Sequence, residues 1–274
     1  MIGLSLVAAL GYGLSDLIGG RAARILDPRL VALVSQVCAT IIACALLVSP
    51  IGAGSPTAHD LVWGAGAGLG AAAGNILIYR GIARHSAVSV APVSGVTAVA
   101  IPVLVDLVTG VVPTVLQAVG LALALPAIWL VSGGGRGISR AALLIGSGAG
   151  AGFGMQFTCL GQTSPNAGLA PLALAQTVSV ITLIAAVGFA GAAARRATVR
   201  GIRDAAAAGL LAGVATVAFQ FAVRLGAAGI AAAVTSMYPA VTVLAAAGFE
   251  RQSITPRAGV GLGLCVVVLV LIAT

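Results

Sequence analysis

The chain has 274 residues, of which 60% are apolar and 7% are charged, and its mean hydropathy is +1.15. This composition excludes an ordinary soluble domain, which carries about 25% charged residues to cover its surface. All 14 basic residues are arginine, six residues are acidic, and the formal net charge is +8. Because the arginines lie in short gaps between apolar runs, they indicate loops that face anionic lipid and not a nucleic-acid-binding surface. The sequence therefore predicts an all-α integral membrane protein.

A helix needs about 20 apolar residues to cross the ~30 Å hydrocarbon core of a bilayer. Ten segments of this length follow one another, separated by Pro, Gly, Ser or charged residues. The first has no basic leader and no small-residue cleavage site, so we expect a retained span and not a signal peptide. The loops are too short to hold a soluble domain. The expected spans are residues 2–20, 30–48, 61–82, 87–108, 114–132, 141–161, 169–193, 205–223, 228–248 and 257–273.

The second half of the chain repeats features of the first at an almost constant offset. Gln176 follows Gln36 by 140 residues, and "GFG" at 152–154 follows "GYG" at 11–13 by 141. Other pairs at the offset of 140 are Tyr79 with Phe219, Arg80 with Gln220 and Arg84 with Arg224. Five spans in each half make the second half inverted in the membrane. The sequence therefore predicts two inverted five-helix repeats, residues 1–135 and residues 136–274.

The distribution of arginine gives an orientation. Thirteen of the 14 arginines fall in odd-numbered loops, and Arg224 alone falls in an even-numbered loop. Repeat-equivalent loops thus differ in charge, as an inverted repeat requires, and the positive-inside rule places the odd loops in the cytoplasm and both termini outside. Arginine without lysine, with abundant Ala, Gly and Val, is typical of a high-GC bacterial genome. We therefore expect a multi-pass protein of a bacterial plasma membrane.

Asp16 is an acid inside an apolar span. An ionised side chain at the bilayer centre costs about 2.5–3.5 kcal/mol on insertion scales, so such a residue needs a reason. Asp16 could carry a coupling proton, pair with a cationic substrate, or lie at the interface and reach toward Arg21 or Arg24. Its repeat-equivalent is Phe157, so the fold itself does not require an acid at this position.

Uncharged polar residues inside spans form a second group of candidates. Lipid offers them no hydrogen-bond partner, so they either join packed helices or line a substrate cavity. The amides are Gln36, Asn75, Gln156, Gln176 and Gln220, and the hydroxyl groups that could join the same lining are those of Tyr12, Ser94, Ser236 and Tyr238. Prolines are expected to interrupt spans 87–108 and 228–248, where kinks and freed carbonyl groups suit a cavity between the halves. They are Pro92, Pro102 and Pro239.

No pattern for catalysis, metal binding or a cofactor is present. The four cysteines lie in apolar segments without a C-x-x-C pair or a Cys/His cluster, and the two histidines have no H-E-x-x-H context. Glycine runs at 64–74 and 146–154 have G-x-x-x-G spacing, which is typical of close helix packing. We therefore expect no enzyme, no cofactor, no metal site and no nucleic-acid partner.

Three stretches resemble the drug/metabolite transporter superfamily, EamA type. The stretch that begins at Phe221 and includes "VTSMYPAVTVLAAAGFERQ" resembles its closing module. The first half offers "YRGIARHSAVSVAPVSGVTAVAIPVLVDLVTG" as the matching module and "AALGYGLSDLIGG" as the first helix. Two features depart from the family pattern. Val111 replaces a glutamate expected after Gly110, and members are commonly drawn with both termini in the cytoplasm.

The resemblance implies a secondary transporter that works by alternating access and most often exports a small metabolite or drug-like compound. Proton coupling or exchange is implied by the family in the same way. The expected partners are a small-molecule substrate, membrane lipids and, where transport is proton-coupled, protons. Alternative functions are a lipid flippase or a non-transporting membrane subunit, and less favoured is an intramembrane enzyme that acts on lipid. The sequence leaves the substrate, the coupling ion, the direction of transport and the oligomeric state open.

Overall fold

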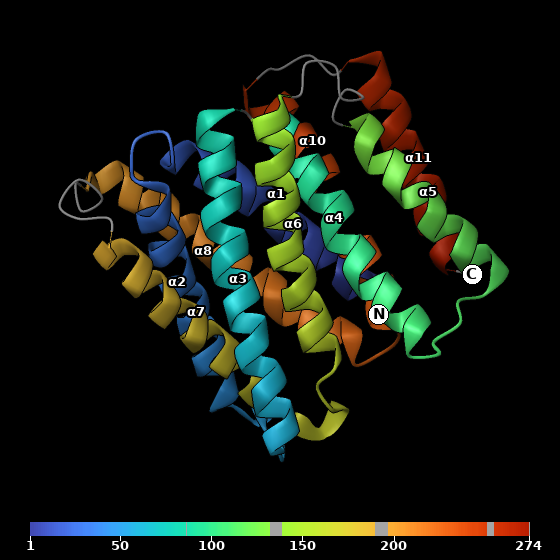
Figure 1. The fold of residues 1–274 in the computed structure, drawn as a ribbon, viewed down its shortest axis with the longest axis horizontal. Helices are drawn as coiled ribbons and strands as arrows, with labels where there is room; N and C mark the ends of the chain where they lie inside the picture. Colours follow the sequence, from blue (N-terminus) through green and yellow to red (C-terminus); the bar gives the residue numbers. More distant parts are fainter. Residues whose placement is uncertain (86, 132–138, 190–196, 251–254, 274) are drawn as a thin grey trace.

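The structure, a computed structural model, describes residues 1–85, 87–131, 139–189, 197–250 and 255–273. These residues form α-helices and two short 3-10 helices, and no strand occurs among them (Figure 1). Eight segments in these ranges are long and apolar enough to cross a membrane, and the apolar helices Val115–Val131 and Pro256–Val268 are shorter. The prediction of a helical, multi-pass membrane protein is confirmed at this level.

The helices follow the expected spans closely. In the first half they are α1 (Ile2–Ala22), α2 (Pro28–Leu47), η1 (Pro50–Gly52), α3 (Ala58–Arg84), α4 (Ala87–Val108) and α5 (Val115–Val131). In the second half they are α6 (Arg140–Gly161), η2 (Pro165–Ala167), α7 (Ala170–Phe189), α8 (Val199–Val223), α9 (Ala228–Thr235), α10 (Tyr238–Glu250) and α11 (Pro256–Ala273).

The prolines act differently in the two spans that they were expected to interrupt. The segment 228–248 is divided into α9 and α10, and Pro239 stands in the first turn of α10, where a missing N–H costs no hydrogen bond. By contrast, α4 continues through Pro92 and Pro102, so the expected interruption does not divide this helix. Neighbouring helices can hold such a helix together, and α4 packs along α6.

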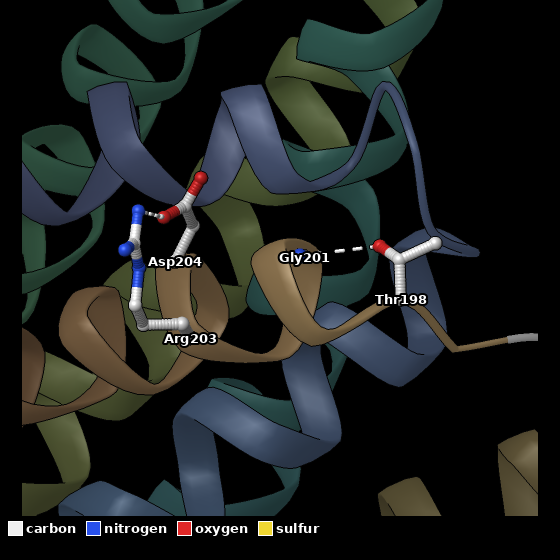
Figure 2. Close-up of polar contacts among 4 residues, drawn as sticks. All are labelled: Thr198, Gly201, Arg203 and Asp204. Atoms are coloured by element: carbon white, nitrogen blue, oxygen red, sulfur yellow. Dashed lines mark hydrogen bonds and ion pairs between the residues drawn. The ribbon is translucent and has the colours of Figure 1, made fainter.

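Successive spans run in opposite directions, so their connections alternate between two ends of the bundle. The upper and left edge in Figure 1 is where α1 and α3 end and where α2, α6, α8 and α11 begin. We call it the arginine end, because nine of the ten described arginines lie in or beside these helix ends: Arg21, Arg24, Arg29, Arg80, Arg84, Arg140, Arg200, Arg203 and Arg257. Arg224 lies at the other end, as do both chain termini. At the arginine end Thr198 caps α8, and Arg203 and Asp204 form an ion pair of 3.6 Å (Figure 2).

The packing of helices between the halves is reciprocal. α1 packs on α8 and α6 packs on α3, so the first helix of each half contacts the third helix of the other. α2 also packs on α8 and α7 on α3, while α2 contacts α7 and α5 contacts α11. The bundle core is therefore built largely from contacts that cross between the halves.

Glycines allow α3 and α6 to approach backbone to backbone. A Cβ atom on Gly152 would lie 2.6 Å from the backbone nitrogen of Gly74, and one on Gly70 would lie 2.6 Å from the carbonyl oxygen of Gly152. Real Cβ atoms do not come this close to backbone atoms. The two glycine runs identified in the sequence thus meet each other, in agreement with the expected close packing.

At the end opposite the arginine end, hydrogen bonds to Asp60 join a loop of the first half to a loop of the second half. The fully buried Asp60 carboxylate accepts hydrogen bonds from the backbone N–H and hydroxyl of Thr57, at 2.8 and 2.7 Å, in the capping box of α3. It also accepts from the backbone N–H and hydroxyl of Ser164 in the second half, at 2.7 and 3.0 Å. The Ser55 N–H donates to the Asn166 carbonyl at 2.9 Å in the same region. We call this group of contacts the Asp60 clasp.

Candidate functional site

Most of the candidate polar residues meet in one hollow between the two halves, which we call the central cavity. Its enclosed space is about 30 Å³, room for one or two water molecules, so a larger substrate requires the halves to move apart. The seven candidates in its lining are Tyr12, Asp16, Gln36, Asn75, Gln156, Gln176 and Tyr238. Ser15, Ala39, Tyr79, Phe153, Phe157, Ala212 and Thr216 complete it.

Three amides from three helices form a hydrogen-bonded network at this cavity. The Gln36 amide on α2 donates to the side-chain carbonyl of Gln176 on α7, and the side-chain carbonyl of Gln36 accepts from the Asn75 amide on α3 at 3.1 Å. Gln36 and Gln176 are 5% and 2% exposed, so water does not compete strongly for these bonds. The two glutamines, 140 residues apart in the chain, therefore bind each other directly where the halves meet.

A second polar contact joins α1 to α8. The hydroxyl oxygens of Tyr12 and Thr216 lie 2.8 Å apart, and the Thr216 hydroxyl also lies 2.8 Å from the backbone carbonyl of Ala212. A threonine hydroxyl has one hydrogen to donate. When Thr216 donates to Ala212, Tyr12 is the donor to Thr216, and the phenol oxygen of Tyr12 remains able to accept a hydrogen bond in the cavity.

Asp16 differs from its neighbours because it lacks a partner. It is 7% exposed and lies on α1 among uncharged lining residues. No hydrogen bond or ion pair joins its carboxylate to any residue in the described part of the chain, and no Arg or His lines the cavity. A carboxylate shielded from water without a countercharge has a high free energy as an anion. The position therefore suits a group that takes up a proton or receives a cation.

Aromatic rings from four helices surround the same space. Tyr12 on α1, Tyr79 on α3, Phe153 and Phe157 on α6 and Tyr238 on α10 all line it. The ring of Phe157 packs 6.1 Å from that of Tyr12 and 4.5 Å from that of Phe219, centroid to centroid. The faces of aromatic rings attract cations, so these rings and the Asp16 carboxylate favour the same sign of charge.

The first helices of the two halves present matching faces to the cavity. Tyr12, Ser15 and Asp16 have the spacing i, i+3, i+4, which places them on one side of α1. On α6 the lining residues Phe153, Gln156 and Phe157 have the same spacing. Each follows its counterpart on α1 by 141 residues. The phenol, hydroxyl and carboxylate groups of α1 thus correspond to a phenyl ring, an amide and a second phenyl ring on α6.

Three of the ten sequence-predicted candidates do not line the central cavity. The buried Gln220 donates to the Thr163 hydroxyl at 3.1 Å, so it joins α8 to the end of α6. Ser94 is buried in α4, where its backbone carbonyl lies against Gly150 of α6. Ser236 is buried in the break between α9 and α10, and its backbone carbonyl lies against Gly95. None of the three is among the residues that line the cavity in this structure.

Several lining residues were not among the candidates, although their helical spacing or their position in the predicted repeat points to them. Ser15 shares a helical face with Tyr12 and Asp16. Phe153 and Phe157 occupy the repeat positions of Tyr12 and Asp16, and Tyr79 lies one turn beyond Asn75 on α3. Thr216 is polar within the apolar α8, as Gln220 is; the two share a face of the helix, and their depth along its axis separates their roles.

Another charged residue, Asp106, lies away from the cavity. The Asp106 carboxylate near the end of α4 accepts a hydrogen bond of 2.5 Å from the backbone N–H of Gly229 in the first turn of α9, a favourable position for an anion. Among the residues that the structure describes, no group of three or more His, Cys, Asp or Glu could hold a metal ion.

Comparisons with known proteins support the fold and leave the activity open. No protein-family model matches the sequence, and no curated protein matches it. Solved structures match it in fold. One of them, described as "Crystal structure of protein", aligns with a TM-score of 0.72 over 99% of this chain and 96% of its own, at 12% sequence identity. At this identity the likeness establishes a shared fold alone.

Proposed function

We propose that the chain is a secondary transporter that moves a small organic cation through the central cavity by alternating access. The observation that carries the proposal is the partnerless Asp16 carboxylate, enclosed by amides and aromatic rings at the meeting place of the two halves. Polar and charged groups inside membrane spans are costly, and they gather where substrates or ions pass. Only 7% of the residues in the chain are charged, and the cavity gathers one of these charges together with several polar groups.

The proposal includes ten spans arranged as two inverted repeats. It is supported by the reciprocal packing of α1 with α8 and of α6 with α3, and by the direct bond between Gln36 and Gln176. An inverted repeat places its substrate site at the interface of the repeats near the middle of the membrane. Rocking of one half against the other would then expose the cavity to each side in turn.

A cation is favoured over an anion as substrate because the cavity offers negative charge and no positive group. Asp16 can pair with an amine or a quaternary ammonium, and the rings of Tyr12, Tyr79 and Tyr238 can add cation–π attraction. Between substrates a proton can neutralise the same carboxylate, which would couple transport to proton movement in the opposite direction. Export is the direction that the family resemblance implies.

The proposed setting is a bacterial plasma membrane, with the arginine end in the cytoplasm and both termini outside. Nine described arginines at one end of the bundle and Arg224 at the other support this orientation by the positive-inside rule. A cysteine introduced at the C-terminus, labelled in intact cells by a membrane-impermeant reagent, tests it. Labelling only after the membrane is permeabilised would reverse the orientation.

Transport is tested with purified protein in liposomes that contain a pH-sensitive dye. A panel of organic cations, with neutral and anionic analogues of similar size, is added to wild type, Asp16→Asn and Asp204→Asn. We expect cations alone to drive proton movement in wild type and in Asp204→Asn, which removes an acid at the arginine end outside the cavity. Asp16→Asn should abolish it. Equal responses of wild type and Asp16→Asn, or a preference for anions, would contradict the proposal.

A further inference from the structure

A second hollow lies at the arginine end, apart from the central cavity, and three arginines line it. Arg29 from the first turn of α2 and Arg80 and Arg84 from the last turns of α3 surround a hollow of about 270 Å³. Asp27 and Pro28 at the start of α2 and Ala23, Ile76 and Ala83 complete the lining. We call it the arginine pocket.

The arginines of this pocket are not paired with an acid in the described ranges. Among the residues that the structure describes, none of the three guanidinium groups forms an ion pair. The single acid in the lining, Asp27, caps α2 and accepts a hydrogen bond of 2.8 Å from the backbone N–H of Arg29. Arg80 and Arg84 lie four residues apart on one face of α3, a spacing at which like charges destabilise a helix. Three cations against one acid leave the hollow with a net positive charge that a bound anion would balance.

The second half of the chain uses the equivalent positions differently. Gln220, the counterpart of Arg80, is buried and bonded to Thr163. Arg224, the counterpart of Arg84, donates to the backbone carbonyl of Gly168 and packs against the ring of Phe221 at 5.4 Å. There one donor group of each side chain bonds to the protein itself, although the Gln220 side-chain oxygen and the Arg224 Nε have no partner among the described residues. The unpaired arginines of the first half are therefore not a requirement of the fold.

The depth of the pocket fits the headgroup layer of a membrane. Arg80 and Arg84 are separated by about 6 Å along the helix axis, and each headgroup layer is about 5–7 Å thick. With the end of α3 at the membrane surface, the pocket would extend through one headgroup layer. Ile76, one turn deeper than Arg80 on α3, would then lie beside the glycerol backbone and the first methylene groups of a lipid.

We infer that the arginine pocket binds the phosphate group of an anionic phospholipid, held by the guanidinium groups of Arg29, Arg80 and Arg84. Guanidinium groups form paired hydrogen bonds with phosphate oxygens, and arginine is the preferred residue for this contact. The inference is independent of the proposed transport activity, because none of its residues lines the central cavity.

The test measures lipid binding to purified, delipidated protein in a neutral detergent. Retained lipids are counted by native mass spectrometry, and protection against thermal unfolding is followed with short-chain phosphatidylglycerol, short-chain phosphatidylcholine or inorganic phosphate. The variants are Arg80→Gln/Arg84→Gln and, in case this pair folds poorly, Arg29→Gln alone. Arg203→Gln is the matched control, because it removes one arginine at the same end that is already paired with Asp204 (Figure 2).

We expect saturable binding of phosphatidylglycerol to wild type and to Arg203→Gln. Binding should be about fivefold weaker for each pocket arginine removed, hence about 25-fold weaker in the double variant. Equal binding to wild type and pocket variants would overturn the site. Equal protection by phosphatidylcholine would overturn the requirement for an anionic lipid. Equal protection by inorganic phosphate would overturn the lipid as ligand and assign the pocket to a soluble anion.

Discussion

Gln36 and Gln176 stand 140 residues apart in the chain and bind each other side chain to side chain. In the proposed inverted repeat each is the counterpart of the other, one on α2 and one on α7. A residue that contacts its own counterpart lies close to the axis that relates two halves of a pseudo-symmetric structure. The central cavity opens beside this pair, so its lining draws on both halves.

Replacing either glutamine with methionine should destabilise the protein, because the remaining amide loses a partner in a nearly water-free position. We expect each single variant to lose about 1 kcal/mol of unfolding free energy. The double variant Gln36→Met/Gln176→Met should lose less than the sum, since it leaves fewer polar groups unpaired. Unfolding in detergent mixtures measures this as a double-mutant cycle. Strict additivity would mean that the two side chains do not interact.

Gly152→Ala should disturb the contact between α3 and α6. A Cβ atom at this position meets the backbone of Gly70 and Gly74, which cannot move aside without shifting the helix. Overpacking of this kind costs about 1–3 kcal/mol, and we expect a lower melting temperature and a lower yield of folded protein. Gly263→Ala is the control, because nothing lies within 4 Å of a Cβ atom there. Equal behaviour of both variants would argue against the close backbone contact.

Asp60→Asn should loosen the clasp between the two loops. The carboxylate accepts four hydrogen bonds, and an amide has one oxygen to replace two, so at least one donor from Thr57 or Ser164 loses its acceptor. We expect a melting temperature several degrees below wild type. Limited proteolysis should also cut the loops around Ser55 and Asn166 faster. Asp204→Asn, which breaks a surface ion pair, should do neither. If Asp60→Asn melts like Asp204→Asn, the clasp does not hold the halves together.

Phe157→Leu should weaken the binding of organic cations selectively. The substitution keeps an apolar side chain but removes the ring from the cavity, and with it one cation–π contribution. We expect about threefold to tenfold weaker binding of a quaternary ammonium compound and little change for its neutral isostere, measured by tryptophan fluorescence or calorimetry. Phe221→Leu removes a ring outside the cavity and serves as the control. An equal loss for the cation and the neutral isostere would assign Phe157 to packing alone.

The course of the chain could be predicted from the sequence better than the rotation of each helix about its axis. The length of the apolar segments, and the Pro, Gly, Ser and charged residues between them, place the spans. Thus α1 and α4 end within two residues of their expected limits. Which face of a helix points inward depends on the packing of the whole bundle. Depth along the axis matters as well, because Thr216 and Gln220 share a face of α8 one turn apart, and yet Thr216 lines the cavity while Gln220 bonds to Thr163.

The candidate site was predictable where helical spacing and the repeat agree. Tyr12 and Asp16 share a face of α1, and the offset of 141 carries that face to Phe153 and Phe157 on α6. Ser94 and Ser236 lie outside the lining, at tight helix contacts next to Gly150 and Gly95 respectively, where a hydroxyl group is small enough to be buried. Polarity alone does not distinguish such a packing residue from a cavity residue.

In the proposed repeat Asp16 corresponds to Phe157, and this difference sets the charge of the cavity. Two identical half-length chains assembled around the same cavity would bring two acids to it, whereas this single chain brings one carboxylate and one ring. The cavity can therefore hold at most one uncompensated negative charge. One monovalent cation, or one proton, saturates it. A cycle that exchanges these two ligands across the membrane moves no net charge, so the membrane voltage would neither drive nor oppose it.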